Sequence, residues 1–147
     1  MARAVLALGS NLGDRKGFLA FAVSSLSRLP QTQVLAQSQW RETAPVDVPE
    51  AFVELTFLNG AVLIETQLSP EALLDAALAI EAEAGRVRTV RNGPRPLDVD
   101  LILYEGERRN TAQLTLPHPR AHLRDFVLEP LRDLGFSAKD VQENRFP

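Results

Sequence analysis

Apolar and polar positions along the chain follow two different periods, and together they predict four strands and two helices before residue 105. Apolar side chains at every second position, or in short continuous runs, are typical of strands. Apolar side chains three or four positions apart are typical of helices. The predicted strands are residues 3–8, 32–42, 57–66 and 97–104, and the predicted helices run from about 14 to 29 and from 69 to 85.

The ends of both predicted helices carry residues that suit a helix terminus. Asp14 can accept a hydrogen bond from the first turn of the first helix, and Pro30 ends that helix. Ser69 and Pro70 form a strong start for the second helix, with serine as the N-cap and proline at the first position. Gly85 suits the C-terminal end of the second helix.

The order strand-helix-strand-strand-helix-strand predicts an α+β fold of the ferredoxin-like β-α-β-β-α-β type. In such a fold both helices pack on one face of an antiparallel sheet, and the other face is left open for ligands or partners. Residues 105–124 are rich in turn signals and residues 126–134 predict a short helix. We therefore expect a C-terminal extension whose last dozen residues are loosely held, and a single domain over residues 1–147.

The composition excludes several classes of site. The 147 residues include no cysteine, which excludes disulfides, thiol catalysis and cysteine-ligated zinc or iron–sulfur centres. Two histidines are too few for a histidine-rich metal site. No apolar run approaches the ~18–20 residues that span a bilayer, and the apolar stretch at the N-terminus is too short for a signal peptide. We therefore expect a cytoplasmic protein that does not associate with membranes.

The formal net charge of −3 argues against a general nucleic-acid binder, but it conceals a segregation of charge along the chain. Residues 41–83 contain nine acidic side chains and a single base, Arg41. Residues 86–95 contain four arginines and no acid, and Asp98 and Asp100 follow directly. This junction is therefore the part of the chain best suited to a charged ligand.

Asp98 and Asp100 are the strongest candidates for chemistry. Residues i and i+2 of a strand point to the same face, so the two carboxylates are expected side by side, with Cα atoms roughly 7 Å apart. Two carboxylates in an otherwise apolar strand need compensation for their desolvation, and Mg²⁺ with substrate phosphates can supply it. The alternative is two exposed acids on the solvent face of a sheet. The neighbouring arginines favour the first interpretation, because metal ions and arginines together neutralise a polyphosphate.

Four other positions leave two interpretations open. Phe57 and Asn59 share one face of a strand and could stack on and hydrogen-bond a planar heterocycle, or could be a core phenylalanine and an amide at a strand edge. His118 lies between two prolines and could donate to a phosphate or be purely structural. Glu81 lies one turn before the end of the second helix and could be a solvated residue or form an orienting ion pair with the arginine loop.

Four segments of the chain resemble, in order, the 6-hydroxymethyl-7,8-dihydropterin pyrophosphokinase family, and the resemblance covers residues 3 to about 134. It implies transfer of pyrophosphate from ATP to 6-hydroxymethyl-7,8-dihydropterin in folate biosynthesis, with release of AMP and with two Mg²⁺ ions as cofactor. The third segment is the most specific motif. The four segments are residues 8–14, residues 57–59, Gly93-Pro94-Arg95-Pro96-Leu97-Asp98-Val99-Asp100-Leu101, and residues 116–120 with 124–131.

The resemblance also implies roles for individual residues. Asp98 and Asp100 match the carboxylates that hold the two Mg²⁺ ions, and Arg86 and Arg95 match arginines that act on the phosphates. Phe57 and Phe126 match the aromatic pair on either side of the pterin. The positions matched to the ATP site are Glu81, Arg86, Arg88, Arg95, Leu101, Thr115, His118 and Arg124. The positions matched to the pterin site are Thr43, Val46, Phe57, Asn59, Asp98 and Phe126.

The chain departs from the family pattern in two loops. Asn92 stands where many relatives have tryptophan, and the loop before it is about one residue short. The segment between Thr43 and Phe57 is longer than usual and acidic. The competing interpretations are a ferredoxin-like module that binds a small ligand and a metal-dependent nuclease that uses the two aspartates. We expect a monomer that binds ATP and the dihydropterin, and no nucleic acid.

Overall fold

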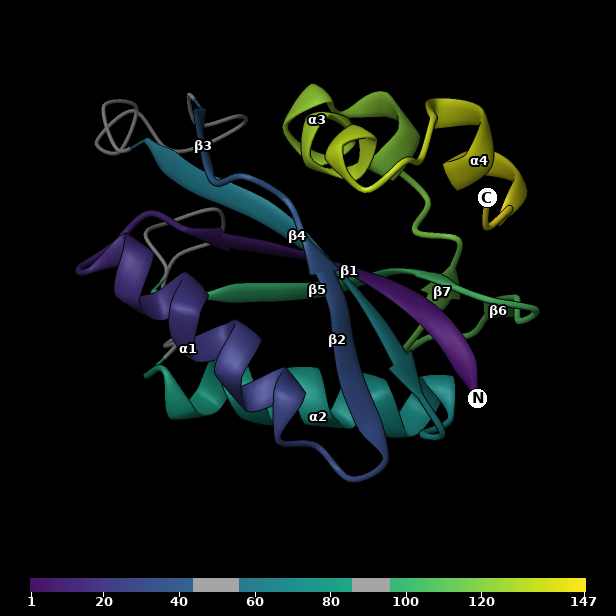
Figure 1. Ribbon diagram of the computed structural model, residues 1–147, viewed down its shortest axis with the longest axis horizontal. Helices are drawn as coiled ribbons and strands as arrows, with labels where there is room; N and C mark the ends of the chain where they lie inside the picture. The colour runs from purple at the N-terminus through teal and green to yellow at the C-terminus, as the bar shows by residue number, and fades with distance from the viewer. Residues whose placement is uncertain (44–55, 86–95) are drawn as a thin grey trace.

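The structure, a computed structural model, describes residues 1–43, 56–85 and 96–147. Within these ranges an antiparallel sheet lies between two groups of helices, α1 and α2 on one side and α3 and α4 on the other (Figure 1). The prediction of a mixed fold with an antiparallel sheet and helices is therefore confirmed.

The main sheet has the strand order β2-β4-β1-β5, and each pairing along this path is antiparallel. The two central strands pair along their whole length, from Ala2 opposite Thr66 to Ser10 opposite Leu58. A central strand covered on both faces is apolar on both faces, which is why β1 and β4 have nearly continuous apolar sequences. The bounds are β1 (Ala2–Ser10), β2 (Thr32–Gln37), β4 (Phe57–Thr66) and β5 (Asp98–Tyr104).

The first face of the sheet is covered by α1 (Arg15–Ser27) and α2 (Pro70–Glu83). Both helices begin as the sequence predicts: the Asp14 side chain accepts from the Gly17 backbone N–H, and the Ser69 side chain accepts from the Ala72 backbone N–H. Apolar side chains from both helices and all the main strands form one continuous core on this face. Its fully buried members include Leu6, Leu19, Leu26, Val62, Ile64, Leu73 and Leu97.

The second face is partly covered, which corrects the expectation of a wholly open face. The helices α3 (Asp125–Asp133) and α4 (Ala138–Glu143) follow a short 3₁₀ turn, η2 (Ala121–Leu123), and pack over one end of the sheet. The two helices cover this face because it carries apolar side chains, and their removal from water stabilises the fold. Its buried members are Val5, Ala61, Ile102, Leu103, Ala121, Val127, Leu128, Leu131, Phe136 and Val141.

The last dozen residues are held in place, so the expectation of a loosely held tail is wrong. Ser137 and Asp140 form a reciprocal capping box at the start of α4, in which each side chain accepts from the other residue's backbone N–H. Val141 is fully buried, and the Phe146 ring lies edge-on to Phe136 with centroids 5.3 Å apart. A few well-placed apolar side chains therefore anchor a segment that is polar on average.

A β-bulge in β5 changes which side chains share a face. Val5 lies opposite Leu103 and Leu6 lies opposite Leu101, so Ile102 is an extra residue on β5. Leu101 joins the core under α1 and α2, whereas Leu103 joins the core under α3 and α4. The alternation of the sequence predicts Leu103 on the same face as Leu101, and that prediction is wrong because of the bulge.

The predicted strand 32–42 is two strands, β2 and β3 (Arg41–Thr43), both paired with β4. At Ser38 the backbone N–H still donates to the Ala61 carbonyl, but the Ala61 N–H donates to the Ser38 hydroxyl. Trp40 then lies against Gly60, where a Cβ would come within 2.1 Å of the indole ring. Gly60 is therefore needed for close packing of the indole against β4.

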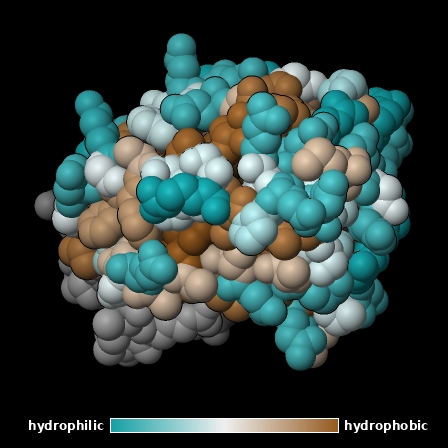
Figure 2. Space-filling model, turned by 60° about the horizontal axis from the view of Figure 1, so that its bottom comes forward, coloured by the Kyte–Doolittle hydropathy of each residue, from teal (hydrophilic) through white to brown (hydrophobic). Residues whose placement is uncertain are grey.

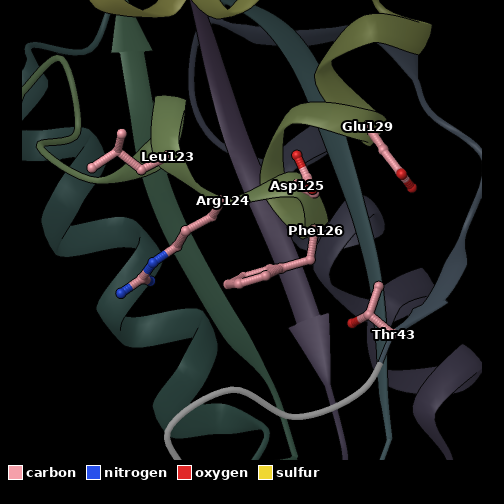
Figure 3. A pocket seen from close by; sticks show the side chains of 6 residues that line it. All are labelled: Thr43, Leu123, Arg124, Asp125, Phe126 and Glu129. Atoms are coloured by element: carbon pink, nitrogen blue, oxygen red, sulfur yellow. The ribbon is translucent and has the colours of Figure 1, made fainter.

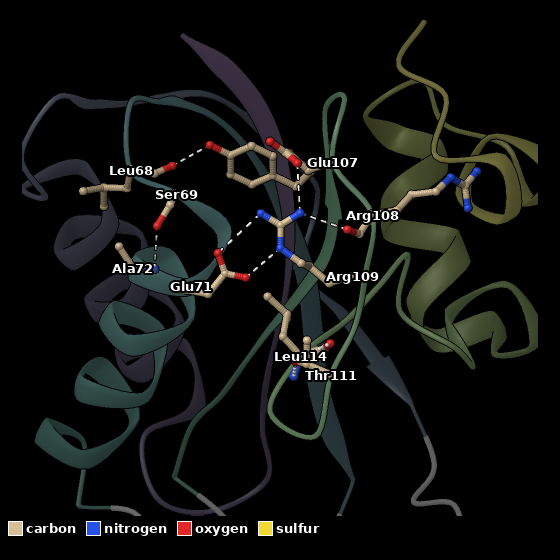
Figure 4. A network of polar contacts seen from close by, with 10 residues as sticks. Leu68, Ser69, Glu71, Ala72, Glu107, Arg108, Arg109, Thr111 and Leu114 are labelled. Carbon is tan, nitrogen blue, oxygen red and sulfur yellow. Dashed lines mark hydrogen bonds and ion pairs between the residues drawn. The ribbon is translucent and has the colours of Figure 1, made fainter.

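A small hairpin of β6 (Arg109–Asn110) and β7 (Thr115–Leu116) follows β5. The Arg109 guanidinium joins this hairpin to α2 through Glu71 and also contacts Glu107 (Figure 4). Nearby, the Tyr104 hydroxyl donates to the Leu68 backbone carbonyl. The hairpin therefore has a fixed position beside β5.

Polar and apolar side chains are interspersed on the face that Figure 2 brings forward. Among the described residues no helix is long and apolar enough to cross a membrane. Five large apolar side chains are exposed among the described residues: Met1, Leu12, Leu35, Leu78 and Leu123.

Candidate active site

One row of residues crosses the open end of the second sheet face. Arg41 lies opposite Asn59, Asn59 lies opposite Gly9, and Gly9 lies opposite Asp98. The row therefore runs through β3, β4, β1 and β5. Because directly opposite residues project to the same face, the Asn59 amide and the Asp98 carboxylate flank the bare backbone of Gly9.

Asp98 and Asp100 lie on this same face, as the sequence predicts. Asp98 is half-buried and Asp100 is exposed, while Val99 between them is buried in the core on the opposite face. Asp100 lies opposite the small residue Ala7 in β1. The two carboxylates fit the donor set that Mg²⁺ takes, since this ion binds through one or two carboxylates and completes its shell with water and phosphate oxygens. Among the described residues no group of three or more potential metal ligands is present.

Glu81 is buried, with 4% of its surface exposed, so the interpretation as a solvated residue is wrong. Its Oε2 atom accepts a hydrogen bond of 2.8 Å from the Val99 backbone N–H. Glu81 therefore joins the last turn of α2 to the segment of β5 that carries both aspartates. Because acidic residues of an amphipathic helix are expected on its exposed side, the sequence alone does not predict this contact.

The Asn59 amide lies in a buried position on a central strand, so the alternative of an amide at a strand edge is wrong. Its Nδ2 atom donates to the Thr43 hydroxyl. A Cβ at Gly9 would come within 2.9 Å of the Asn59 Oδ1 atom and 3.6 Å of the Phe57 ring. Gly9, Thr43, Asn59 and the half-buried Phe57 therefore form a surface on which a flat polar ring can lie.

A pocket of about 340 Å³ opens beside this surface, where the N-terminus of α3 faces β3 (Figure 3). The Arg124 guanidinium lies over the Phe126 ring, with the guanidinium carbon 5.7 Å from the ring centroid. Phe126 and Glu129 are three residues apart on the helix and lie on one side of it. The lining residues are Thr43, Leu123, Arg124, Asp125, Phe126 and Glu129. The sequence does not predict Leu123, Asp125 or Glu129 as site residues. Of these three, only Glu129 could have been found, because it lies one helical turn after Phe126.

His118 is positioned by the bulge in β5. Its backbone N–H donates to the Ile102 carbonyl at 2.9 Å, and its Nδ1 atom accepts from the Arg120 backbone N–H at 3.3 Å. Burial lowers the pKa of His118, and the nearby positive charges of Arg124 and Arg120 lower it further. The imidazole is therefore neutral at pH 7, with Nε2 as its donor when Nδ1 accepts.

Two other positions matched to the nucleotide lie near β5. Thr115 is in β7, half-buried, and β7 packs beside β5. Leu101 is 4% exposed and its side chain lies in the core under α1 and α2, on the face opposite the aspartates. Arg86, Arg88, Arg95 and Val46 lie outside the described residues.

Comparison with known proteins decides the family. The sequence model of the 7,8-dihydro-6-hydroxymethylpterin-pyrophosphokinase (HPPK) family matches residues 5–135. The chain belongs to this family. The matched span includes the whole main sheet from Val5 onward, the row through Gly9 and the N-terminus of α3. The family resemblance predicted from the sequence is therefore confirmed.

Curated HPPK relatives are similar over most of the chain. The 2-amino-4-hydroxy-6-hydroxymethyldihydropteridine pyrophosphokinase of Methylorubrum extorquens is 44% identical over 136 residues, which are 92% of this chain and 84% of that protein. The enzyme of the same name from Bacillus subtilis is 44% identical over 131 residues, which are 89% of this chain and 77% of that protein.

Solved structures share the fold at low sequence identity. A crystal structure described as HPPK-DHPS in complex with substrates has a TM-score of 0.67 and 12% identity. The Plasmodium falciparum HPPK-DHPS structure with SDX-DHP has a TM-score of 0.65 and 14% identity. In each case the match covers 97% of this chain and 43% of the longer solved chain.

Proposed function

We propose that this HPPK-family chain transfers pyrophosphate from ATP to 6-hydroxymethyl-7,8-dihydropterin, releasing AMP and the dihydropterin diphosphate in folate biosynthesis. The observation that carries the proposal is the row in which Asn59, Gly9 and Asp98 lie side by side across β4, β1 and β5. This row puts a group that can recognise a polar ring beside a group that can hold a metal-bound phosphate.

The pterin subsite is proposed at the open surface around Gly9. The Asn59 amide offers an acceptor and donors for the polar edge of the ring, and the Thr43 hydroxyl fixes its orientation. Phe57 and Phe126 are both half-buried and supply aromatic faces for stacking. Val46 completes this subsite in the proposal.

The nucleotide subsite is proposed on the β5 side of the row. Asp98 and Asp100 would hold two Mg²⁺ ions, whose charge would neutralise the triphosphate and polarise its oxygens when bound. The neutral His118 would donate a hydrogen bond to a phosphate oxygen, and Arg124 would add positive charge. The remaining proposed contacts on this face are Arg86, Arg88, Arg95 and Thr115. The side chains of Glu81 and Leu101 lie on the opposite face of β5, so Glu81 is proposed to act through its hydrogen bond to Val99, and Leu101 through its backbone.

In the proposed reaction no side chain of the protein acts as the nucleophile. The nucleophile is the hydroxymethyl oxygen of the dihydropterin, which attacks the β-phosphorus of ATP, and AMP is the leaving group. The chain holds both substrates in line and keeps charged groups at fixed positions, which is the main source of rate in phosphoryl transfer. This role agrees with a sequence that has no cysteine and two histidines.

The fold is proposed to be a ferredoxin-like variant with a C-terminal extension. The support is the strand order β2-β4-β1-β5 with antiparallel pairing, together with α3 and α4 on the second face. A cytoplasmic location, a monomeric state and a single domain over residues 1–147 stay predictions.

A nucleotide assay tests the proposed function. The protein is incubated with MgATP, with and without 6-hydroxymethyl-7,8-dihydropterin, and the nucleotide products are separated. AMP formed only with the dihydropterin, in equal amount to the dihydropterin diphosphate, is the expected result. ADP as the product, or no nucleotide turnover, would contradict the proposal.

A further inference from the structure

The two sides of the candidate pocket come from elements that are far apart in the sequence. Thr43 is the last residue of β3, whereas Phe126 and Glu129 belong to α3 (Figure 3). Among the described strands β3 pairs with β4 alone and is three residues long. So short an edge strand has few backbone hydrogen bonds, and its position relative to α3 depends on side-chain contacts.

The Asp133 carboxylate makes this connection with both of its oxygens. Its Oδ1 atom accepts from the Arg41 guanidinium at 2.5 Å, and its Oδ2 atom accepts from the Gln39 backbone N–H at 3.2 Å. The side chains of Arg41 and Asp133 are 33% and 27% exposed. One carboxylate therefore holds the chain on both sides of Trp40, at the start of β3.

The helix position of Asp133 is by itself unfavourable for an acidic side chain. It is the last residue of α3, where the helix dipole presents its negative end and repels a carboxylate. The ion pair with Arg41 and the hydrogen bond from Gln39 offset that repulsion. An aspartate at this position is therefore explained by its contact with β3 and not by the stability of the helix itself.

Asp133 also lies on the side of α3 that forms the pocket. Phe126, Glu129 and Asp133 are spaced three and four residues apart, so they follow one side of the helix. Arg41 lies opposite Asn59 in β4, in the row that continues to Gly9. The ion pair therefore joins the row of the proposed pterin subsite to the helix that carries Phe126.

We propose that Arg41 and Asp133 are positioning residues that fix the separation between β3 and α3, and with it the fit of the pocket to the dihydropterin ring. Neither side chain lines the pocket, so both act through Thr43 and Phe126. This inference rests on the proposed function, because it assigns a selective effect on one of the two substrates.

Steady-state kinetics on Arg41→Met and Asp133→Asn test the inference, with KM measured separately for the dihydropterin and for MgATP. We expect KM for the dihydropterin to rise about tenfold and KM for MgATP to change less than about twofold, because a misplaced binding wall affects only the substrate it contacts. Arg145→Met is the matched control, since Arg145 forms a 2.8 Å ion pair with Asp140 in α4, outside the pocket. The control should keep both KM values.

A spectroscopic measurement separates local positioning from general stability. Trp40 is the single tryptophan of the chain and lies between the two residues that Asp133 holds. Its emission in the native state should shift in Arg41→Met and in Asp133→Asn, and should not shift in Arg145→Met. Since the two side chains act as one unit, the double variant should be no worse than the more severe single variant.

Each outcome decides between the two proposals. A wild-type protein that forms no AMP contradicts the proposed function. An active wild type, with unchanged dihydropterin KM in both variants, overturns the positioning role. Additive effects in the double variant would also overturn it. Arg41→Lys keeps the charge and replaces Arg41→Met if the latter does not fold. Its KM for the dihydropterin should lie between those of the wild type and Asp133→Asn. Equal increases in KM for both substrates would contradict the inference.

Discussion

The Glu81 carboxylate accepts a hydrogen bond of 2.8 Å from the backbone N–H of Val99, the residue between the two aspartates of β5. This contact relates the end of α2 to the strand position from which the aspartates project on the other face. A buried acid under the sheet thus holds the backbone that carries two acids above it.

Replacing Glu81 by alanine should destabilise the fold by about 1–3 kcal/mol, because a buried backbone donor loses its acceptor. Glu81→Gln keeps an acceptor oxygen and should cost less. Urea denaturation measures both values. Glu83→Ala, at an exposed position of the same helix, should change stability by less than about 0.5 kcal/mol. Equal losses in the alanine and glutamine variants would contradict the role of the hydrogen bond.

Gly9→Ala should weaken dihydropterin binding while leaving the fold intact. The added Cβ would lie 2.9 Å from the Asn59 Oδ1 atom, so the amide must turn away, and a short side chain can do so at small cost. We expect KM for the dihydropterin to rise about tenfold, which is ~1.4 kcal/mol. In an Asn59→Ala background, where there is no amide to displace, the same change at Gly9 should have a smaller effect. Full additivity of the two changes would argue against this explanation.

Asp98→Asn and Asp100→Asn should each lower kcat by more than about a hundredfold, because metal charge stabilisation is worth several kcal/mol of the barrier. The half-saturating Mg²⁺ concentration should rise in any residual activity. Initial rates over a Mg²⁺ titration measure both effects. Full Mg²⁺-dependent turnover in either variant would contradict the metal assignment.

Acidification should destabilise the protein partly through His118. Burial, then Arg124 and Arg120, lower the pKa of His118 in the folded chain. Below about pH 6.5 the unfolded chain therefore binds a proton that the folded chain resists, and stability falls as pH falls through this value. His118→Gln removes this proton uptake and should lose less stability than the wild type between about pH 7.5 and pH 5.5, as measured by urea denaturation at each pH. Parallel stability curves would exclude this contribution.

Much of the fold can be predicted from periodicity and helix-capping residues. Asp14 and Ser69 mark the helix starts because capping requires a side-chain acceptor at one defined position. The face shared by Asp98 and Asp100 follows from the two-residue period of a strand. These features depend on local geometry, which a short stretch of sequence determines.

The features that the sequence does not predict depend on contacts between distant residues. The bulge at Ile102 follows from the register between β5 and β1, and it moves Leu103 to the other face. The packing of the Trp40 ring depends on Gly60 in a different strand. The contact between Glu81 and Val99 joins residues 18 positions apart. Resemblance to a family implies site roles that no local pattern carries, such as the proposed stacking of Phe126 on the pterin.

The two helices on the second sheet face have a practical consequence for inhibitors. A planar molecule placed over Gly9 meets α3 on one side, where Arg124 and Phe126 line the pocket, and that side sets a limit to its size. On the other side, β1 continues from Gly9 to the small residue Ala7, which lies opposite Asp100. Chemical groups added to such a molecule should therefore point along β1 toward the aspartates, where added length would reach the proposed nucleotide subsite.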